Sequence, residues 1–175
     1  MKLYYSPGAC SLASHIALKE AGLSFEAIKV DGRAKKAANG EDYWQVTAKG
    51  YVPALRLDDG SVLTEGTAIL PYIGDRAPAS GLAPAAGTMD RYRVHEWLGY
   101  INSEGHKGFG PFFNPAATDA MKQAAAETLK KRLGYIESQL GGKSFLLGEQ
   151  FTVADCYLFT ILGWLRYAGL ELSQW

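Results

Sequence analysis

The hydrophobic and polar positions near the N-terminus follow first a strand pattern and then a helix pattern. Residues 2–5 and 25–30 are predicted as short strands, and residues 11–21 between them carry apolar side chains at helical spacing. Gly22 is placed to end that helix. A helix that links two strands of this length is typical of a βαβ unit with parallel strands.

A hairpin and a second helix follow in residues 54–75. Two short apolar runs, 54–57 and 61–64, flank Asp58-Asp59-Gly60, and an Asp-Gly turn between such runs predicts a β-hairpin. The order β-α-β, polar loop, β-β-α predicts a four-stranded mixed sheet with helices. The first part of the chain is therefore expected to be an α/β domain.

The chain changes character after residue 76. Residues 77–88 consist only of Ala, Pro, Ser, Gly, Leu and Thr, a composition typical of a linker. Beyond residue 88 only helical patterns occur. We therefore expect an α/β domain in residues 1–76, a linker in 77–88 and an all-helical domain in 89–175.

Three helices are predicted in residues 89–175. Thr118 can cap the second of them, which Gly141-Gly142 ends. Thr152 and Asp155 form a capping box before the third, which is apolar nearly all round and is expected to be the buried centre of this half. The positions expected to be buried in the first two helices are Val94, Trp97, Leu98, Ile101, Met121, Ala125, Leu129, Leu133, Ile136 and Leu140.

Composition and charge exclude several classes of function. Among 175 residues, 18 Lys and Arg balance 18 Asp and Glu, so net charge attracts neither nucleic acid nor an anionic membrane. No apolar run reaches the length of a membrane span. Two cysteines are too few for a disulfide framework, and no targeting signal precedes the first strand, so a cytoplasmic location is expected.

Cys10 is the most informative single residue. It follows a strand and a Pro-Gly turn and opens a helix, where unpaired backbone N–H groups favour a thiolate. A small core residue at the strand–helix corner is the alternative, but the preceding turn favours a thiol site. Ala13 stands where a dithiol pair would have its second cysteine. Cys156 lies in an apolar helix and is expected to be core.

Two further segments could bind a peptide-like ligand. A cis Pro53 would turn the backbone of Val52 outward to pair with an extended ligand, although a trans proline at an edge strand is favoured on spacing alone. Free N–H groups at Gly66 and Thr67 could hold a carboxylate, with Glu65 beside them for an ammonium group. Simple helix capping explains the same residues equally well.

The histidines do not suggest a metal site. His15, His95 and His106 lack the i, i+4 pairing and the cysteine spacing of metal ligands. No phosphate loop, dinucleotide fingerprint or G-x-S-x-G motif is present. We therefore expect neither a metal nor a nucleotide cofactor.

Five segments together resemble the bacterial beta-class glutathione S-transferases. They are residues 1–12 (MKLYYSPGACSL), 50–55 (GYVPAL), 63–69 (LTEGTAI), 106–109 (HKGF) and 151–155 (FTVAD). They occur in the order of the family's motifs and extend over essentially the whole chain. The combination is specific, although each segment alone is not.

The resemblance implies a fold and a set of site residues. The fold is a thioredoxin-like N-terminal domain followed by a helical-bundle C-terminal domain, in a cytoplasmic homodimer that serves detoxification. Relatives usually continue past the position of Trp175, so a shortened C-terminal domain is expected. Catalytic roles are implied for Cys10, His106, Ser11 and Tyr5, and glutathione contacts for Lys35, Val52, Pro53 in the cis form, Glu65, Gly66, Ser103 and Glu104, the last from the partner subunit.

The implied activity is conjugation of the glutathione thiolate to apolar electrophilic substrates, with glutathione as co-substrate. Two alternatives stay open. Cys10 could act as a glutaredoxin-like thiol transferase through a mixed disulfide. The chain could also be a non-catalytic glutathione-fold protein that binds apolar ligands. The second-substrate pocket is expected between the domains, lined by Tyr5, Phe109, Phe112, Phe113 and Trp164.

Overall fold

A mixed sheet organises the N-terminal half of the chain. The computed structural model describes all residues, 1–175. Strand β1 lies at the centre of the sheet, parallel to β2 and antiparallel to β4, in the order β3-β2-β1-β4-β5. The predicted βαβ unit and hairpin are both confirmed. The strands are β1 (Lys2–Tyr5), β2 (Glu26–Asp31), β3 (Lys36–Ala37), β4 (Ala54–Arg56) and β5 (Val62–Thr64).

The predicted count of four strands is wrong by one short strand. The polar stretch expected as a loop contains β3, which pairs antiparallel with β2 at Val30 and Ala37. A one-turn helix, α2 (Tyr43–Val46), follows directly, and the side chain of Asp42 caps its first turn. Elements of two to four residues are too short to carry a periodic pattern, so only tertiary pairing specifies them.

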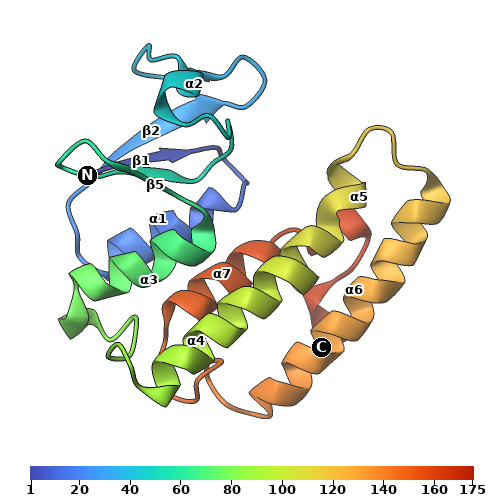
Figure 1. Cartoon of the computed structure of the whole chain (residues 1–175). Coiled ribbons are helices and arrows are strands. Elements are labelled where there is room, and N and C mark those ends of the chain that lie inside the picture. Colours follow the sequence, from blue (N-terminus) through green and yellow to red (C-terminus); the bar gives the residue numbers. More distant parts are fainter.

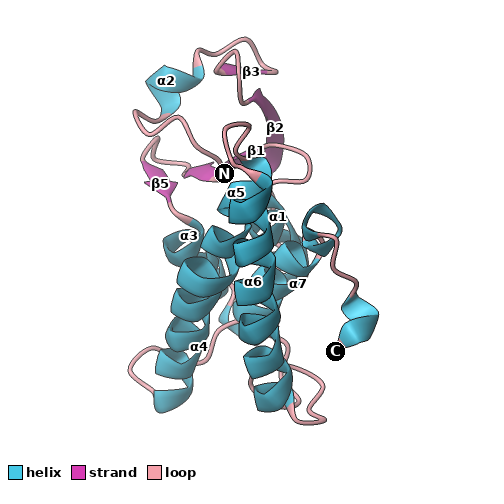
Figure 2. Cartoon of the chain, turned by 90° about the vertical axis from the view of Figure 1, so that its right-hand side faces the viewer, coloured by secondary structure: helices cyan, strands magenta, loops and turns pink.

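Helices α1 (Ser11–Glu20) and α3 (Gly66–Arg76) lie side by side between the sheet and the helical half (Figure 1). Helix α1 also packs against α7 (Val153–Leu162) on its other side. Small side chains make this close packing possible, because Ala13 and Ala17 are almost completely buried. The sheet therefore rests on the helical half through α1 and α3, as the turned view in Figure 2 also shows.

The helical half consists of one interrupted and two regular helices. A continuous helical run begins with α4 (Met89–Tyr100), passes through a π-helical segment (Ile101–Gly105) and a 3₁₀ segment (His106–Phe109), and ends with α5 (Gly110–Phe113). Helix α6 (Asp119–Leu140) and helix α7 follow. Thr118 caps α6 and the Thr152–Asp155 capping box starts α7, as predicted. No helix is both long and apolar enough to cross a bilayer.

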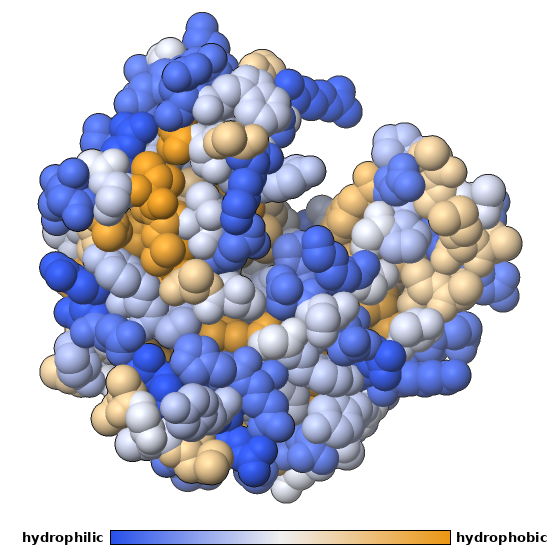
Figure 3. Space-filling view, viewed as in Figure 1, coloured by the Kyte–Doolittle hydropathy of each residue, from blue (hydrophilic) through white to orange (hydrophobic).

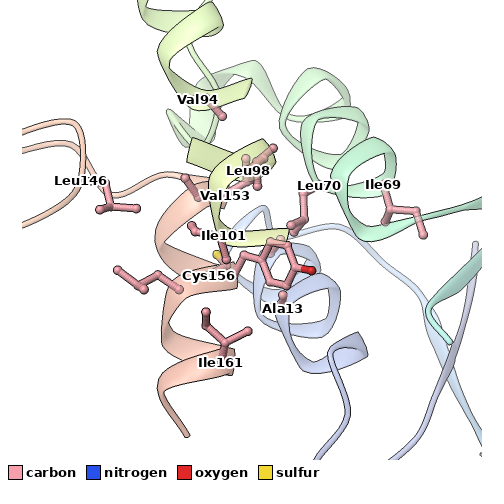
Figure 4. Close-up of a cluster of buried hydrophobic side chains, with 14 of the residues drawn as sticks. Ala13, Ile69, Leu70, Val94, Leu98, Ile101, Leu146, Val153, Cys156 and Ile161 are labelled. Atoms are coloured by element: carbon pink, nitrogen blue, oxygen red, sulfur yellow. The ribbon is translucent and has the colours of Figure 1, made fainter. Parts of the chain in front are cut away.

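One hydrophobic core extends through both halves. Figure 4 shows Ala13 of α1, Leu70 of α3, Leu98 of α4 and Cys156 of α7 converging in it. Cys156 is fully buried, as expected for a core residue. Residues 77–88 also contribute to this core, through Leu82 and Ala83. The two halves therefore pack as one body rather than as units joined by a flexible spacer.

The predicted core is wrong at one position in each of two helices. Met121, in the first turn of α6, is 50% exposed, and Phe159 of α7 is 65% exposed. Leu129, Leu133 and Ile136 are buried as predicted. For Met121 the reason is that periodicity does not indicate how far along a helix its neighbours extend. Phe159 lies on the one side of α7 that is exposed, which a helix apolar nearly all round does not reveal.

Candidate active site

A cavity of about 680 Å³ lies between the sheet edge and the helical half. In Figure 3 the molecule is hollowed between the N-terminal half and the α5 end of the helical half. Both halves contribute side chains, so the cavity exists only in the assembled fold. It is lined by Cys10, Ala13, Lys49, Tyr51, Val52, Pro53, Thr64, Glu65, Gly66, Leu70, Asn102, His106, Lys107, Gly110, Phe113, Asn114 and Tyr157.

The Val52-Pro53 peptide forms one wall of the cavity and is cis. Spacing alone favoured a trans bond, and that interpretation is wrong. The backbone N–H of Val52 has no hydrogen-bond partner within the chain, whereas its carbonyl accepts one from Cys10 Sγ at 3.3 Å. An unpaired donor next to strand β4 is suited to the backbone of an extended ligand.

The start of α3 forms the second wall. The N–H groups of Gly66 and Thr67 lie in the first turn, where a helix offers no acceptor of its own. Glu65 directly before them has a positive φ of 72° and accepts a hydrogen bond from Lys49 Nζ at 2.6 Å. Free helix N–H groups beside a carboxylate are complementary to the carboxylate and ammonium groups of an amino acid.

Cys10 lines the cavity as a neutral thiol. Burial raises its pKa to about 11, and this effect exceeds the opposing effect of the backbone N–H groups of Cys10 and Ser11. Glu65 across the cavity raises the pKa further, and Lys107 lowers it. The expected stabilisation of a thiolate at the helix start is therefore wrong for the unliganded chain, because desolvation outweighs the helix terminus.

His106 lines the same cavity as Cys10 but comes from the other half of the molecule. Its Nδ1 lies 2.6 Å from the hydroxyl of Tyr157, and that hydroxyl donates to Asn102 Oδ1 at 3.0 Å. Burial lowers the pKa of His106, and the neighbouring Lys107 lowers it further. The ring is therefore neutral near pH 7. Tyr157 and Asn102 were not predicted as site residues, because the two contacts join positions 51 and 55 residues apart in the sequence.

Comparison with known proteins gives the family. Residues 8–76 match the glutathione S-transferase N-terminal domain, and residues 100–174 match the C-terminal domain. Over 173 residues the chain is 46% identical to glutathione S-transferase GstA of Escherichia coli O157:H7, covering 99% of this chain and 86% of the relative. This chain belongs to the glutathione S-transferase family.

Solved structures agree with that assignment. A ternary complex of BphK, a bacterial glutathione S-transferase, shares 54% identity and a TM-score of 0.97 over 100% of this chain and 88% of that chain. A sphingomonad glutathione S-transferase complexed with glutathione shares 52% identity and a TM-score of 0.96 over 99% and 87%. The beta-class enzyme of Sphingomonas chungbukensis shares 48% identity and a TM-score of 0.95 over 99% and 87%. The resemblance stated from the sequence, and the thioredoxin-like and helical architecture it implied, are confirmed.

A second, smaller pocket of about 390 Å³ adjoins the first in this transferase fold. Cys10, His106 and Phe113 line both pockets, which therefore meet at these three residues. Of the five aromatic residues expected around the second substrate, Phe113 and Trp164 line this pocket and Tyr5, Phe109 and Phe112 do not. Trp164 Nε1 donates to the carbonyl of Gly8 at 2.8 Å, which fixes one wall against the turn before Cys10. The remaining lining residues are Pro7, Gly8, Ala9 and Tyr167.

Two of the residues with implied catalytic roles support the site from outside the cavity. Ser11 is fully buried, and its hydroxyl donates to the carbonyl of Ser6 at 3.3 Å and accepts from the N–H of Ser6 at 3.2 Å. The Tyr5 ring lies edge-on to the His15 ring, with the ring centroids 5.8 Å apart. These side chains serve turn closure and packing.

Three residues with implied glutathione contacts also lie outside the cavity of their own chain. Lys35 Nζ donates to the carbonyl of Gly50 at 2.8 Å. Ser103 is exposed, and Glu104 pairs with Arg132 at 2.7 Å. The cavity instead contains two lysines, Lys49 and Lys107, that the sequence analysis did not assign to it. The single signal for Lys49 was its place in the loop before the cis proline.

Proposed function

We propose that this protein binds glutathione in the larger pocket and conjugates it, through its sulfur, to an apolar electrophile held in the smaller one. The meeting of the two pockets at Cys10 and His106 carries the proposal. The sulfur atom of glutathione at that junction would be in reach of both pockets. Glutathione S-transferase GstA and a relative complexed with glutathione support the same activity.

The charges and free donors of the larger pocket match glutathione along its length. Glutathione is an extended peptide-like molecule with two carboxylates and one ammonium group. Glu65 and the start of α3 would hold the γ-glutamyl end, and the unpaired N–H of Val52 would pair with the cysteinyl backbone. Lys49 and Lys107 would balance the carboxylates. Lys35 would reach the glycyl end only by leaving its bond to a backbone carbonyl.

Activation of the thiol is the chemical task of the junction. A cysteine thiol has an ordinary pKa of about 8.5, and lowering it by two units requires about 2.7 kcal/mol of preferential stabilisation of the thiolate. The neutral thiol of Cys10 has one hydrogen, which it donates to the Val52 carbonyl and can turn to that thiolate instead. His106 can accept the proton, and the N–H groups at the start of α1 add a favourable dipole. These contributions together would supply the required stabilisation.

The raised pKa of Cys10 disfavours the thiol-transferase alternative. The thiolate is the nucleophile in thiol–disulfide exchange. A thiol whose pKa is about 11 is almost fully protonated near pH 7 and attacks a disulfide slowly. We therefore assign Cys10 to hydrogen bonding with the glutathione sulfur. Homodimer formation with Glu104 of the partner subunit near glutathione, a glutathione contact of Ser103 and a cytoplasmic location stay predictions.

Binding and turnover should be measured separately. We expect calorimetry to show one glutathione site per chain and a spectrophotometric assay with 1-chloro-2,4-dinitrobenzene to show conjugation. Lys49→Ala should weaken glutathione binding about tenfold, as expected for loss of a charge-assisted contact. The exposed Lys36→Ala serves as its matched control and should bind as the wild type does. Glutathione binding without turnover of any electrophile would contradict the proposal and favour a ligand-binding protein.

Cys10→Ala tests the assignment of the thiol. Conjugation should persist at a reduced rate, because the variant loses one hydrogen-bond donor and keeps His106 and the helix start. Loss of glutathione-dependent disulfide reduction with conjugation kept would make Cys10 a redox residue only.

A further inference from the structure

Three side chains that line the larger pocket form a hydrogen-bonded chain, which ends at the junction of the two pockets. Asn102 of the π-helical segment accepts from the hydroxyl of Tyr157 at 3.0 Å, and His106 Nδ1 lies 2.6 Å from the same hydroxyl. Tyr157 comes from α7 and is 3% exposed. The Trp164 ring packs edge-on against His106, with centroids 4.9 Å apart.

The direction of these hydrogen bonds determines where His106 carries its proton. The phenol of Tyr157 has a single hydrogen, which it donates to Asn102 Oδ1. The Tyr157 oxygen must therefore accept from His106, so Nδ1 carries the ring hydrogen. A neutral imidazole has only one N–H group. Nε2 is consequently unprotonated, and His106 lines both pockets.

We propose that Asn102 and Tyr157 are positioning residues that keep Nε2 of His106 free to accept the proton of the glutathione thiol. The inference rests on the proposed conjugation and adds the residues that prepare its base. In the step, the S–H bond breaks, an Nε2–H bond forms, and the electron pair stays on sulfur. Nδ1–H continues to donate to Tyr157, so the hydrogen bonds to Tyr157 and Asn102 keep their directions.

The groups around His106 are compatible with this role. Lys107 is adjacent in sequence, Cys10 faces it from the start of α1, and Glu65 and Lys49 lie across the larger pocket. Burial raises the pKa of Tyr157, so its hydroxyl keeps its hydrogen throughout the pH range of an assay. A thiolate formed at the junction would stabilise the imidazolium, because opposite charges at close range favour each other.

The tautomer of His106 is directly measurable in the unliganded protein. We expect ¹⁵N NMR of histidine-labelled protein to show a neutral ring with Nδ1 protonated and Nε2 bare. Asn102→Ala removes the acceptor, so Tyr157 can donate to Nδ1 and move the proton to Nε2. Tyr157→Phe keeps the ring but removes the oxygen, so the Nε2–H tautomer becomes populated.

The rate of conjugation should fall in the variants in which the tautomer of His106 changes. Both variants should lose about tenfold in kcat for conjugation, the effect of one hydrogen bond, and the pH at which kcat is half-maximal should shift. Asn102→Asp keeps an acceptor oxygen and should keep the wild-type tautomer. Tyr135→Phe, at an exposed tyrosine of α6, is the matched control and should change neither readout.

Two results would overturn the proposal. One is a wild-type His106 with hydrogen on Nε2. The other is an unchanged tautomer and kcat in both Asn102→Ala and Tyr157→Phe, since at least one must respond if the hydrogen bonds set the proton position. The NMR measurement needs no glutathione, so a wild-type protein that fails to conjugate would contradict the proposed function and not the tautomer assignment.

Discussion

Asp155 connects the first turn of α7 to the loop before it. Its Oδ2 accepts from the backbone N–H of Thr152 at 2.8 Å and from the Thr152 hydroxyl at 2.9 Å, and its Oδ1 accepts from the N–H of Leu146 at 2.9 Å. Asp155 is 8% exposed and Thr152 is fully buried. Asp155→Ala would leave these donors without an acceptor.

The cost can be estimated from the number of donors left unpaired. The Thr152 hydroxyl can rotate to another acceptor, but the two backbone N–H groups cannot. Each buried donor without a partner costs about 1–3 kcal/mol, so the variant should lose roughly 2–6 kcal/mol of unfolding free energy. For a protein of this size that corresponds to a fall in Tm of roughly 5–20 °C. Asp155→Asn keeps one acceptor oxygen and should lose about half as much.

Calorimetry and urea unfolding measure this loss. Asp119→Ala is the matched control, since Asp119 also lies in the first turn of a helix but is exposed. Its contribution is limited to the helix dipole, about 0.3–1 kcal/mol. If Asp155→Ala is no less stable than Asp119→Ala, the three hydrogen bonds of Asp155 do not hold the start of α7 against the preceding loop.

Three further predictions concern packing and protonation. Gly74→Ala should lower Tm, because its Cβ would lie 2.5 Å from Ala83 Cβ and overpacking costs about 1–3 kcal/mol. The added Cβ of Gly99→Ala meets no atom within 4 Å, so this variant should raise Tm, because Ala stabilises a helix by up to about 1 kcal/mol relative to Gly. A change of Tm in the same direction in both variants would contradict this account of the packing. Alkylation of Cys10 by iodoacetamide should be slow at pH 7 and accelerate toward its pKa of about 11, whereas a rate that levels off below pH 8 would show a stabilised thiolate. Hydrogen bonds from a tyrosine and an arginine lower the pKa of Glu41 from 4.5 to about 2. The contribution of the Glu41 carboxylate to the stability of the fold is therefore complete above pH 4.5 and is lost as pH falls through about 2. The stability difference between wild type and Glu41→Gln should therefore disappear toward pH 2, and a difference independent of pH would argue against these bonds.

The regular elements and the family were predictable from the sequence because their signals are local. Strand β1, helix α1, the β4–β5 hairpin and the caps of α6 and α7 each depend on residues within a few positions of one another. Strand β3 was not predictable in the same way, because two residues carry no period and their pairing partner lies in another strand. The cis bond before Pro53 was expected only from the family resemblance, because spacing alone favoured a trans bond.

The candidate site was predictable only in part. Cys10, Val52, Glu65 and His106 line the cavity, whereas Lys35 lies outside it, where its ammonium group bonds a backbone carbonyl. A motif reports which residue types are present. It does not report which lysine of several reaches a cavity formed by two distant parts of the chain.

The sequence by itself therefore determined the elements, their order, the change from α/β to helical character after residue 76 and the membership of a transferase family. The tertiary structure decided the chemical state of the site. Cys10 opens a helix that favours a thiolate, yet burial between the halves makes it a neutral thiol. His106 acquires its tautomer from Tyr157, 51 residues away. Desolvation and hydrogen-bond direction depend on every group brought near by folding, so no local pattern in the sequence encodes them.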